Sequence, residues 1–297
     1  MTHGRARLFD KEQNFAVLMV APAVLVLIVT TSFPLAYLIW NSFHSINLAM
    51  PFMNGFVGFA NYTAMLHDGE FWHSLGLTAI YTISTVVFQL VIGLGLALLV
   101  MQIPAGQWLF RIVAILPIVL APVVVGLFWR TLMLAPNFGI VDFAAKALGF
   151  GSVNWLGSPV PALVSVIIIH TWQWTPFAFL VLLASLASLP PDVYEAARID
   201  RANAVSRFIH ITLPLIRPAI VIVVIMRSMI ALSAFAAIFA ATGGGPGTAT
   251  EILNLYAYRT SFVDLNFGYG SALAVALLVI TLIVSSILFA MRAARGR

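Results

Sequence analysis

Six long apolar segments constrain the fold of this chain more than any other feature. They lie at about residues 15–40, 76–101, 109–132, 161–184, 218–241 and 268–291. Each is long enough for a transmembrane helix, which needs about 17–25 residues. Only 8% of the residues are charged, against about 25% in a soluble domain. The sequence therefore predicts an all-α polytopic membrane protein in which residues 1–297 form a single domain with six transmembrane helices.

Prolines interrupt several of these segments, at Pro22, Pro34, Pro117, Pro122 and Pro176. A proline inside a transmembrane helix frees a carbonyl, and neighbouring helices can satisfy that carbonyl. We therefore expect each apolar segment to remain one span. A β-barrel is not expected, because its strands alternate between apolar and polar residues.

Basic residues predict the orientation, because cytoplasmic loops carry an excess of Lys and Arg. One side of the expected membrane holds eleven of them and the other side three, and Arg227 lies inside the fifth span. The eleven are Arg5, Arg7, Lys11, Arg111, Arg198, Arg201, Arg207, Arg217, Arg292, Arg295 and Arg297, and the three are Arg130, Lys146 and Arg259. Both termini and the loop 185–217 are therefore predicted to be cytoplasmic.

Several chemistries find no support in the sequence. Cysteine is absent, so disulfides, thiolate nucleophiles and cysteine-bound metals are excluded. The net charge of +5 is spread over the ends of apolar segments and does not indicate nucleic-acid binding. No phosphate-binding G-x-x-x-x-G-K-[ST] motif occurs, and no acid/base constellation lies within the spans. We expect neither catalysis nor a bound cofactor in this chain.

The stretch from His67 to His73 has two interpretations. It contains four potential metal ligands, but their spacing matches no zinc site. The alternative, which we favour, is a polar cap on the second span.

The loop 185–217 is the one expected cytoplasmic segment large enough to be structured. Pro191 followed by Asp192 indicates a helix start. Helical spacing relates Val193, Ala196, Ala197 and Asp200. A second short helix is expected over 203–212, ended by Pro214 and Pro218. The pair would form a rigid docking knob or, alternatively, a simple amphipathic connector.

This loop resembles the E-A-A loop of ATP-binding-cassette importer permeases. The resemblance rests on Glu195-Ala196-Ala197, Asp200, Leu213-Pro214 and Pro218. The stretches from Asn61-Tyr62 to Thr78 and from Thr242 to Phe262 resemble the carbohydrate branch of that family. The whole chain is similar to the first permease of maltose-, trehalose- and glycerol-phosphate-type importers.

The resemblance implies an inner-membrane complex with a second permease, two cytoplasmic ATPase subunits that bind ATP and Mg, and an external solute-binding protein. Glu195, Ala196, Ala197 and Asp200 would dock into an ATPase cleft. The family usually has Gly after this Asp, where this chain has Arg201. Since Arg does not readily adopt φ > 0, we expect the turn to shift into a helical extension, with Arg201 contacting the ATPase.

Arg227 is the one charge left in the membrane. Inserting such a charge costs about 2.5–3.5 kcal/mol, so it marks a functional hypothesis. Either Arg227 faces a water-filled cavity or gate, or it holds the second permease through carbonyls. The family often carries Arg here, which favours a shared gating or structural role.

The fourth span places His170, Gln173, Trp174 and Phe177 on one face, with Trp172 pointing away from Trp174. Aromatic platforms with a few fixed polar groups suit a sugar. The alternative is interhelical packing joined by His–Gln hydrogen bonds. Gln89 in the second span and Ser233 in the fifth are weaker candidates for the same cavity.

These features predict a permease subunit that imports a sugar by alternating access. The alternatives are an importer permease for an amino acid or a phosphate ester, a secondary carrier, or a membrane enzyme. A proton- or sodium-coupled carrier usually needs intramembrane carboxylates, and none of the ten acids lies at mid-span.

Overall fold

The computed structural model describes residues 3–103, 106–149, 151 and 153–293. The chain forms two compact units, one of Met1–His67 with Arg259–Val275 and the other of Asp68–Tyr258 with Ala276–Arg297. Of the basic residues used to predict orientation, Arg295 and Arg297 lie outside the described residues. The side chains of Arg5, Arg7, Lys11, Arg198 and Arg292 are also not described.

The first unit contains one long helix and a small surrounding framework. Its elements are α1 (His3–Ser42), β1 (His44–Ser45), η1 (Pro51–Met53), β2 (Gly55–Phe56), α2 (Ala60–His67), η4 (Arg259–Val263) and the start of α13 (Phe267–Ala293). The two short strands pair antiparallel, with His44 opposite Phe56. α1 remains helical through Pro22 and Pro34, as expected, and its described apolar side chains are largely exposed within this chain.

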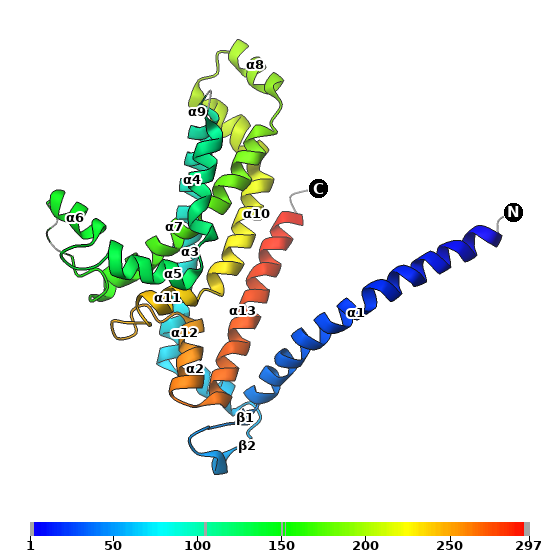
Figure 1. Ribbon diagram of the computed structural model, residues 1–297, viewed down its shortest axis with the longest axis vertical. Coiled ribbons are helices and arrows are strands. Elements are labelled where there is room, and N and C mark those ends of the chain that lie inside the picture. The colour runs from blue at the N-terminus through cyan, green and yellow to red at the C-terminus, as the bar shows by residue number, and fades with distance from the viewer. Residues whose placement is uncertain (1–2, 104–105, 150, 152, 294–297) are drawn as a thin grey trace. The chain divides into compact units, whose positions relative to one another are not determined.

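The second unit is a helical bundle with short helices at both ends (Figure 1). Its elements are α3 (Gly69–Met101), α4 (Gln107–Val119), α5 (Pro122–Phe128), η2 (Trp129–Met133), α6 (Ile140–Ala147), α7 (Pro159–Ala187), α8 (Pro191–Ile199), α9 (Ala204–Arg207), η3 (Phe208–Thr212), α10 (Leu213–Leu232), α11 (Ala236–Ala241), α12 (Leu253–Tyr258) and the rest of α13. The helices α3, α7 and α10 pack together and form its core.

Small residues let α3 and α7 approach closely. A Cβ atom added to Gly93 of α3 would lie 2.8 Å from the Cβ of Ala178 and 2.9 Å from the backbone nitrogen of Phe179 on α7. Ala97, one turn further along α3, is also fully buried. In a membrane, packing of this kind replaces the hydrophobic effect as the force that joins helices.

Five described helices are long and apolar enough to cross a membrane, or six if the bent pair of α4 and the helix that follows it counts as one span. This agrees with the expected all-α fold. The third apolar segment, however, is not one straight helix, because its two halves meet at 96°. Ala121 is extended in front of Pro122, the conformation that the ring of a following proline favours. The third apolar segment is therefore bent at Pro122, and it completes the expected six spans if the bent pair counts as one.

The fifth span also differs from the expected range 218–241. It is helical from Ala204, passes through the π-turn η3, and ends at Leu232. Pro214 and Pro218 therefore do not end the preceding helix; the wider π-turn directly before Leu213 absorbs the break in the regular ladder. At the other end, the Asn254 side-chain amide donates to the carbonyls of Ser233 and Ala234 at 3.2 and 3.3 Å. These hydrogen bonds stabilise the non-helical step before α11.

The stretch from His67 to His73 contains the start of α3. The Asp68 carboxylate accepts a hydrogen bond from the Glu70 backbone N–H at 2.8 Å, which is an N-cap. Among the described residues, no three or more His, Asp or Glu side chains lie close enough together to hold a metal ion. The geometry agrees with the polar-cap interpretation.

Candidate functional site

The intramembrane charge of Arg227 lies at the centre of the helical core. Its side chain is fully buried. Its Nε donates to Gln89 Oε1 on α3 at 2.7 Å, and its Nη2 lies 3.1 Å from His170 Nε2 on α7. The guanidinium also lies 4.4 Å from the ring centroid of Trp174. Arg227 therefore joins three helices of one chain.

The partners of this guanidinium are neutral. Gln89 is held at both ends, since its Nε2 donates to the His170 carbonyl at 3.3 Å. Because the guanidinium has only donors, His170 Nε2 must accept, and this requires a neutral imidazole. Such hydrogen bonds offset part of the cost of burying a charge. We call Arg227, Gln89, His170, Trp174 and Tyr81 the Arg227 cluster.

Tyr81 belongs to the cluster, although the sequence did not indicate it. Its ring lies 5.2 Å from the ring of His170. The hydroxyl of Tyr81 and the Nη1 atom of Arg227 have no hydrogen-bond partner among the described residues. The sequence feature that could have identified Tyr81 is its position eight residues before Gln89, on the same face of α3.

The other three cavity candidates lie elsewhere. Gln173 Nε2 donates to the Leu120 carbonyl at 3.1 Å, where α4 ends. Phe177 packs against the apolar core. Ser233 is exposed, and its hydroxyl donates to the Met229 carbonyl of its own helix. The structure thus brings together Gln89, His170, Trp174 and Arg227, but not Gln173, Phe177 or Ser233.

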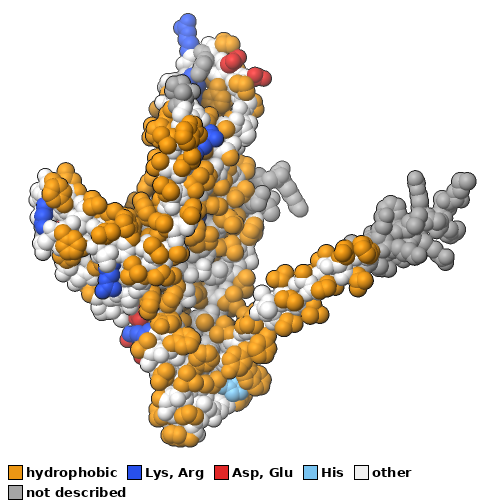
Figure 2. Space-filling view, viewed as in Figure 1, with side chains coloured by type: hydrophobic (Ala, Val, Ile, Leu, Met, Phe, Trp, Pro, Cys, Tyr) orange, Lys and Arg blue, Asp and Glu red, His pale blue; other side chains and the backbone are white. Residues whose placement is uncertain are grey.

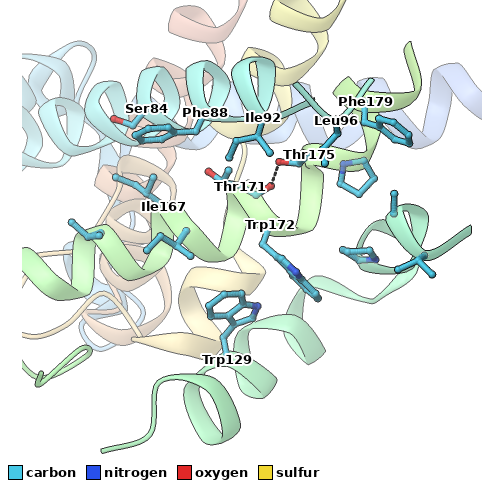
Figure 3. Close-up of a pocket in the computed structure, with 16 residues that line it drawn as sticks. Ser84, Phe88, Ile92, Leu96, Trp129, Ile167, Thr171, Trp172, Thr175 and Phe179 are labelled. Carbon is cyan, nitrogen blue, oxygen red and sulfur yellow. Dashed lines mark hydrogen bonds between the residues drawn. The ribbon is translucent and has the colours of Figure 1, made fainter. Parts of the chain in front are cut away.

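A groove of about 790 Å³ opens between α3, α4 and α7 (Figure 3). Trp129 and Trp172 meet edge to face in it at 5.7 Å, and Thr175 donates to the Thr171 carbonyl of its own helix. None of the cavity candidates lines this groove. Its lining is mostly apolar and suits an apolar occupant better than a molecule with many hydroxyls.

The loop between α7 and α10 forms the short helix α8, as expected. Figure 2 shows acidic side chains at this end of the second unit. Glu195, Ala196 and Asp200 are exposed, whereas Ala197 is buried within the chain. Glu195 and Ala196 of α8 and Asp200, which follows its last residue, are accessible to another protein.

Arg201 does not extend α8, and this expectation is wrong. The residue adopts a left-handed conformation with φ of 56°, and the Ala202 N–H donates to the Ala197 carbonyl at 2.9 Å. This is the 6→1 bond of a Schellman motif. Asn203 caps the next helix through the Ser206 N–H at 2.7 Å. These two bonds hold the turn in the form that Gly would adopt, despite a cost of about 1–2 kcal/mol for a residue with a Cβ.

A second buried ionisable group lies in the segment between η2 and α7. Asp142 of α6 forms a salt bridge with Lys146 at 2.9 Å and accepts hydrogen bonds from the backbone N–H groups of Asn137 and Val153. The hydrogen bond with Lys146 is the main cause that holds the pKa of Asp142 below its usual value, against the opposing effect of burial. The carboxylate fixes this segment from three directions.

Comparisons with known proteins cover nearly the whole chain. A family model described as "Binding-protein-dependent transport system inner membrane component" matches residues 89–295. The sulfoquinovosyl glycerol transport system permease protein SmoG of Agrobacterium fabrum is 37% identical over 93% of this chain and 89% of its own length. The trehalose/maltose transport system permease protein MalF of Thermococcus litoralis is 34% identical over 93% of both chains. Among solved structures, a bacterial ABC transporter involved in the import of the acidic polysaccharide alginate superposes with a TM-score of 0.83 at 20% identity, over 99% of this chain and 100% of that one.

Proposed function

This chain belongs to the family of inner membrane components of binding-protein-dependent transport systems, and we propose that the solute it imports is a sugar or a sugar derivative. As a member of this family, it is a transport subunit and not an enzyme. One observation carries this proposal. Permeases whose names specify trehalose, maltose or sulfoquinovosyl glycerol are at least 34% identical to this chain over 93% of its length.

The proposed partners are a second permease, two ATPase subunits and an external solute-binding protein. The family description supports the binding protein. The exposed side of α8, with Glu195, Ala196 and Asp200, supports docking to an ATPase, and Arg201 lies at the end of that surface. ATP and Mg would be bound by the ATPase subunits, and this chain would hold no cofactor. The exposed apolar surface of α1 would contact lipid and the second permease.

The chain is a polytopic membrane permease, and we place it in the inner membrane with both termini and α8 on the cytoplasmic side. ATP-driven closure of the ATPase subunits would move α8 and turn the transport cavity outward. Hydrolysis would reset it. Within this cycle the Arg227 cluster acts as an interior gate. Its bonds join α3, α7 and α10, and the unsatisfied donors of Tyr81 and Arg227 would bind water or a solute oxygen when these helices separate.

Uptake by the reconstituted complex tests the solute class. The complex is placed in proteoliposomes with external binding protein, and ATP-dependent uptake of labelled disaccharides and sugar glycerols is measured beside an amino acid and a phosphate ester. We expect uptake of a sugar only. Uptake of the amino acid or the phosphate ester alone would refute the proposal.

Charge reversal tests the docking surface. Glu195→Lys should abolish co-purification of the ATPase subunits, because it places a cation in the exposed E-A-A segment. Glu70→Lys, an exposed acid at the start of α3, is the matched control and should leave the complex intact. Equal yields of ATPase with both variants would remove α8 as the docking site.

A test of the gate uses the cluster itself. Trp174→Ala and His170→Ala should change the stimulation of ATP hydrolysis by loaded binding protein, since both residues contact Arg227 or its partners. Normal stimulation in both variants would reduce the cluster to a packing role.

A further inference from the structure

A side-chain hydrogen bond joins α8 to the base of α10. The hydroxyl of Tyr194 lies 2.9 Å from Oγ1 of Thr212. Thr212 is the last residue of the π-turn η3 and is 6% exposed. Tyr194 is half-buried. The contact therefore connects two elements through residues that are 18 positions apart in the chain.

The backbone between these two residues is irregular at two points. The first is the left-handed turn at Arg201, and the second is the π-turn over Phe208–Thr212. Helices bend at π-turns and prolines, where the regular ladder is interrupted. The covalent path alone would thus yield when α8 is pushed. The Tyr194–Thr212 bond bypasses both irregular points.

The two sides of α8 have different surroundings. Tyr194 and Ala197, three residues apart, face the chain, and Ala197 is 7% exposed. Glu195 and Asp200 are exposed on the other side. Tyr194 therefore links the side of α8 opposite to the exposed acids with Thr212 at the start of α10.

α10 leads from this contact to the Arg227 cluster. Thr212 and Arg227 are fifteen residues apart in one helical run, a distance of about 22 Å at 1.5 Å per residue. At its far end Arg227 is bonded to Gln89 and His170. When the base of α10 moves, the hydrogen bonds of Arg227 to α3 and α7 therefore either resist the movement or carry these two helices along.

We propose that the Tyr194–Thr212 hydrogen bond makes α8 and the base of α10 one rigid lever, which transmits displacement of α8 to the Arg227 cluster. Both side chains are positioning residues for transport. The inference rests on the proposed function, because it requires α8 to be the element that the ATPase moves.

Removing either hydroxyl tests the lever in the complete complex. Tyr194→Phe and Thr212→Val should each lower the amount of solute imported per ATP hydrolysed about fivefold, the factor that corresponds to one net hydrogen bond. The yield of the complex and its basal ATP hydrolysis should stay at the wild-type level. The double variant should be no worse than either single variant. Tyr37→Phe, on the exposed surface of α1, is the matched control and should leave the ratio unchanged.

A covalent bridge provides a second, independent measurement. The chain has no cysteine, so Tyr194→Cys with Thr212→Cys introduces the only two thiols in this subunit. Before cross-linking, this double-cysteine variant should import as little solute per ATP hydrolysed as the single variants. A short bifunctional thiol reagent that links the two positions should restore import per ATP, and a monofunctional reagent of the same chemistry should not.

The outcomes separate the two hypotheses. Absence of ATP-dependent uptake by the wild-type complex would refute the proposed function itself. Normal import per ATP in Tyr194→Phe, or failure of the bridge to restore it, would overturn the lever while leaving the importer function in place. Loss of the ATPase subunits from Tyr194→Phe would also overturn it, because the bond would then serve docking.

Discussion

α1 and α7 are both apolar and long enough to span a membrane, yet their surroundings within the chain are opposite. Among the most apolar 18 residues of each helix, 67% are buried in α7 and 0% in α1. α7 is the less apolar of the two and carries His170, Gln173 and Trp174. The middle of α1 carries Thr30, Thr31 and Ser32, and the hydroxyls of Thr30 and Thr31 donate to carbonyls of their own helix. Apolar composition therefore identifies a span, and polar residues within it indicate which span lies in the protein interior.

The largest expected effect comes from the charge at the centre of the buried helices. Arg227→Ala removes the donor for Gln89 Oε1 and His170 Nε2, and each hydrogen bond to a charged group contributes about 1.5–3 kcal/mol. We expect a marked fall in the melting temperature of the purified chain in detergent. Arg217→Ala, an exposed arginine on the same helix, should stay within about 0.5 kcal/mol of wild type. Equal stability of the two variants would show that the hydrogen bonds of Arg227 to Gln89 and His170 do not stabilise the helical core.

The same substitution in each helix tests directly whether α7 is buried within the chain and α1 is not. Ile169 of α7 is 1% exposed, whereas Ile28 of α1 is 56% exposed. Ile169→Ala should lower the free energy of unfolding by about 2–5 kcal/mol, the usual cost of a cavity at a buried Ile. Ile28→Ala should leave the stability of the isolated chain nearly unchanged. A similar loss at both positions would show that α1 is packed within this chain.

The close contact of α3 with α7 can be tested with two glycines of one helix. Gly93→Ala places a methyl group against Ala178 and Phe179, and overpacking of this kind costs about 1–3 kcal/mol. Gly95→Ala meets no atom within 4 Å and should be neutral or stabilising by up to about 1 kcal/mol through helix propensity. Thermal unfolding of both variants measures the difference. A stable Gly93→Ala variant would show that α3 and α7 separate easily.

The smallest effect concerns Asp142, the buried carboxylate of α6, which lies outside the candidate spans. Because the pKa of Asp142 is lowered on folding, its contribution to stability is complete above the unfolded value of about 3.9 and is lost as the pH falls through the lowered folded value. Asp142→Asn should therefore be less stable than wild type at pH 7, and the two melting temperatures should converge at acidic pH. A constant difference over the whole range would show that the charge of Asp142 does not contribute.

The sequence predicted the secondary structure well where one residue type decides the conformation. The helix after Pro191 forms, and a helix begins at Ala204, one residue after the predicted start at 203. It failed where hydrogen bonds outside the regular helical pattern decide the conformation. Arg201 takes a left-handed conformation because the bonds of the turn require it. The fifth span ends at Leu232 because Asn254, 21 residues beyond Ser233, binds the freed carbonyls.

The candidate site shows the same division. Periodicity placed His170 and Trp174 on one face of a helix, and both do contact Arg227. The same periodicity grouped Gln173 and Phe177 with them, but Gln173 binds the end of α4 instead. A helical wheel gives the direction of a side chain, whereas the neighbouring helix in that direction depends on the packing of the whole bundle.

The sequence by itself determined that this chain is a helical membrane permease, because apolar length and the E-A-A segment are local properties of the residues. Only the tertiary structure decided that Arg227 is bonded inside its own subunit and that Tyr194 is bonded to the base of α10. Both depend on contacts between residues far apart in the chain. Such contacts depend on which helices pack closely at small residues such as Gly93. No local sequence pattern specifies which two helices pack together.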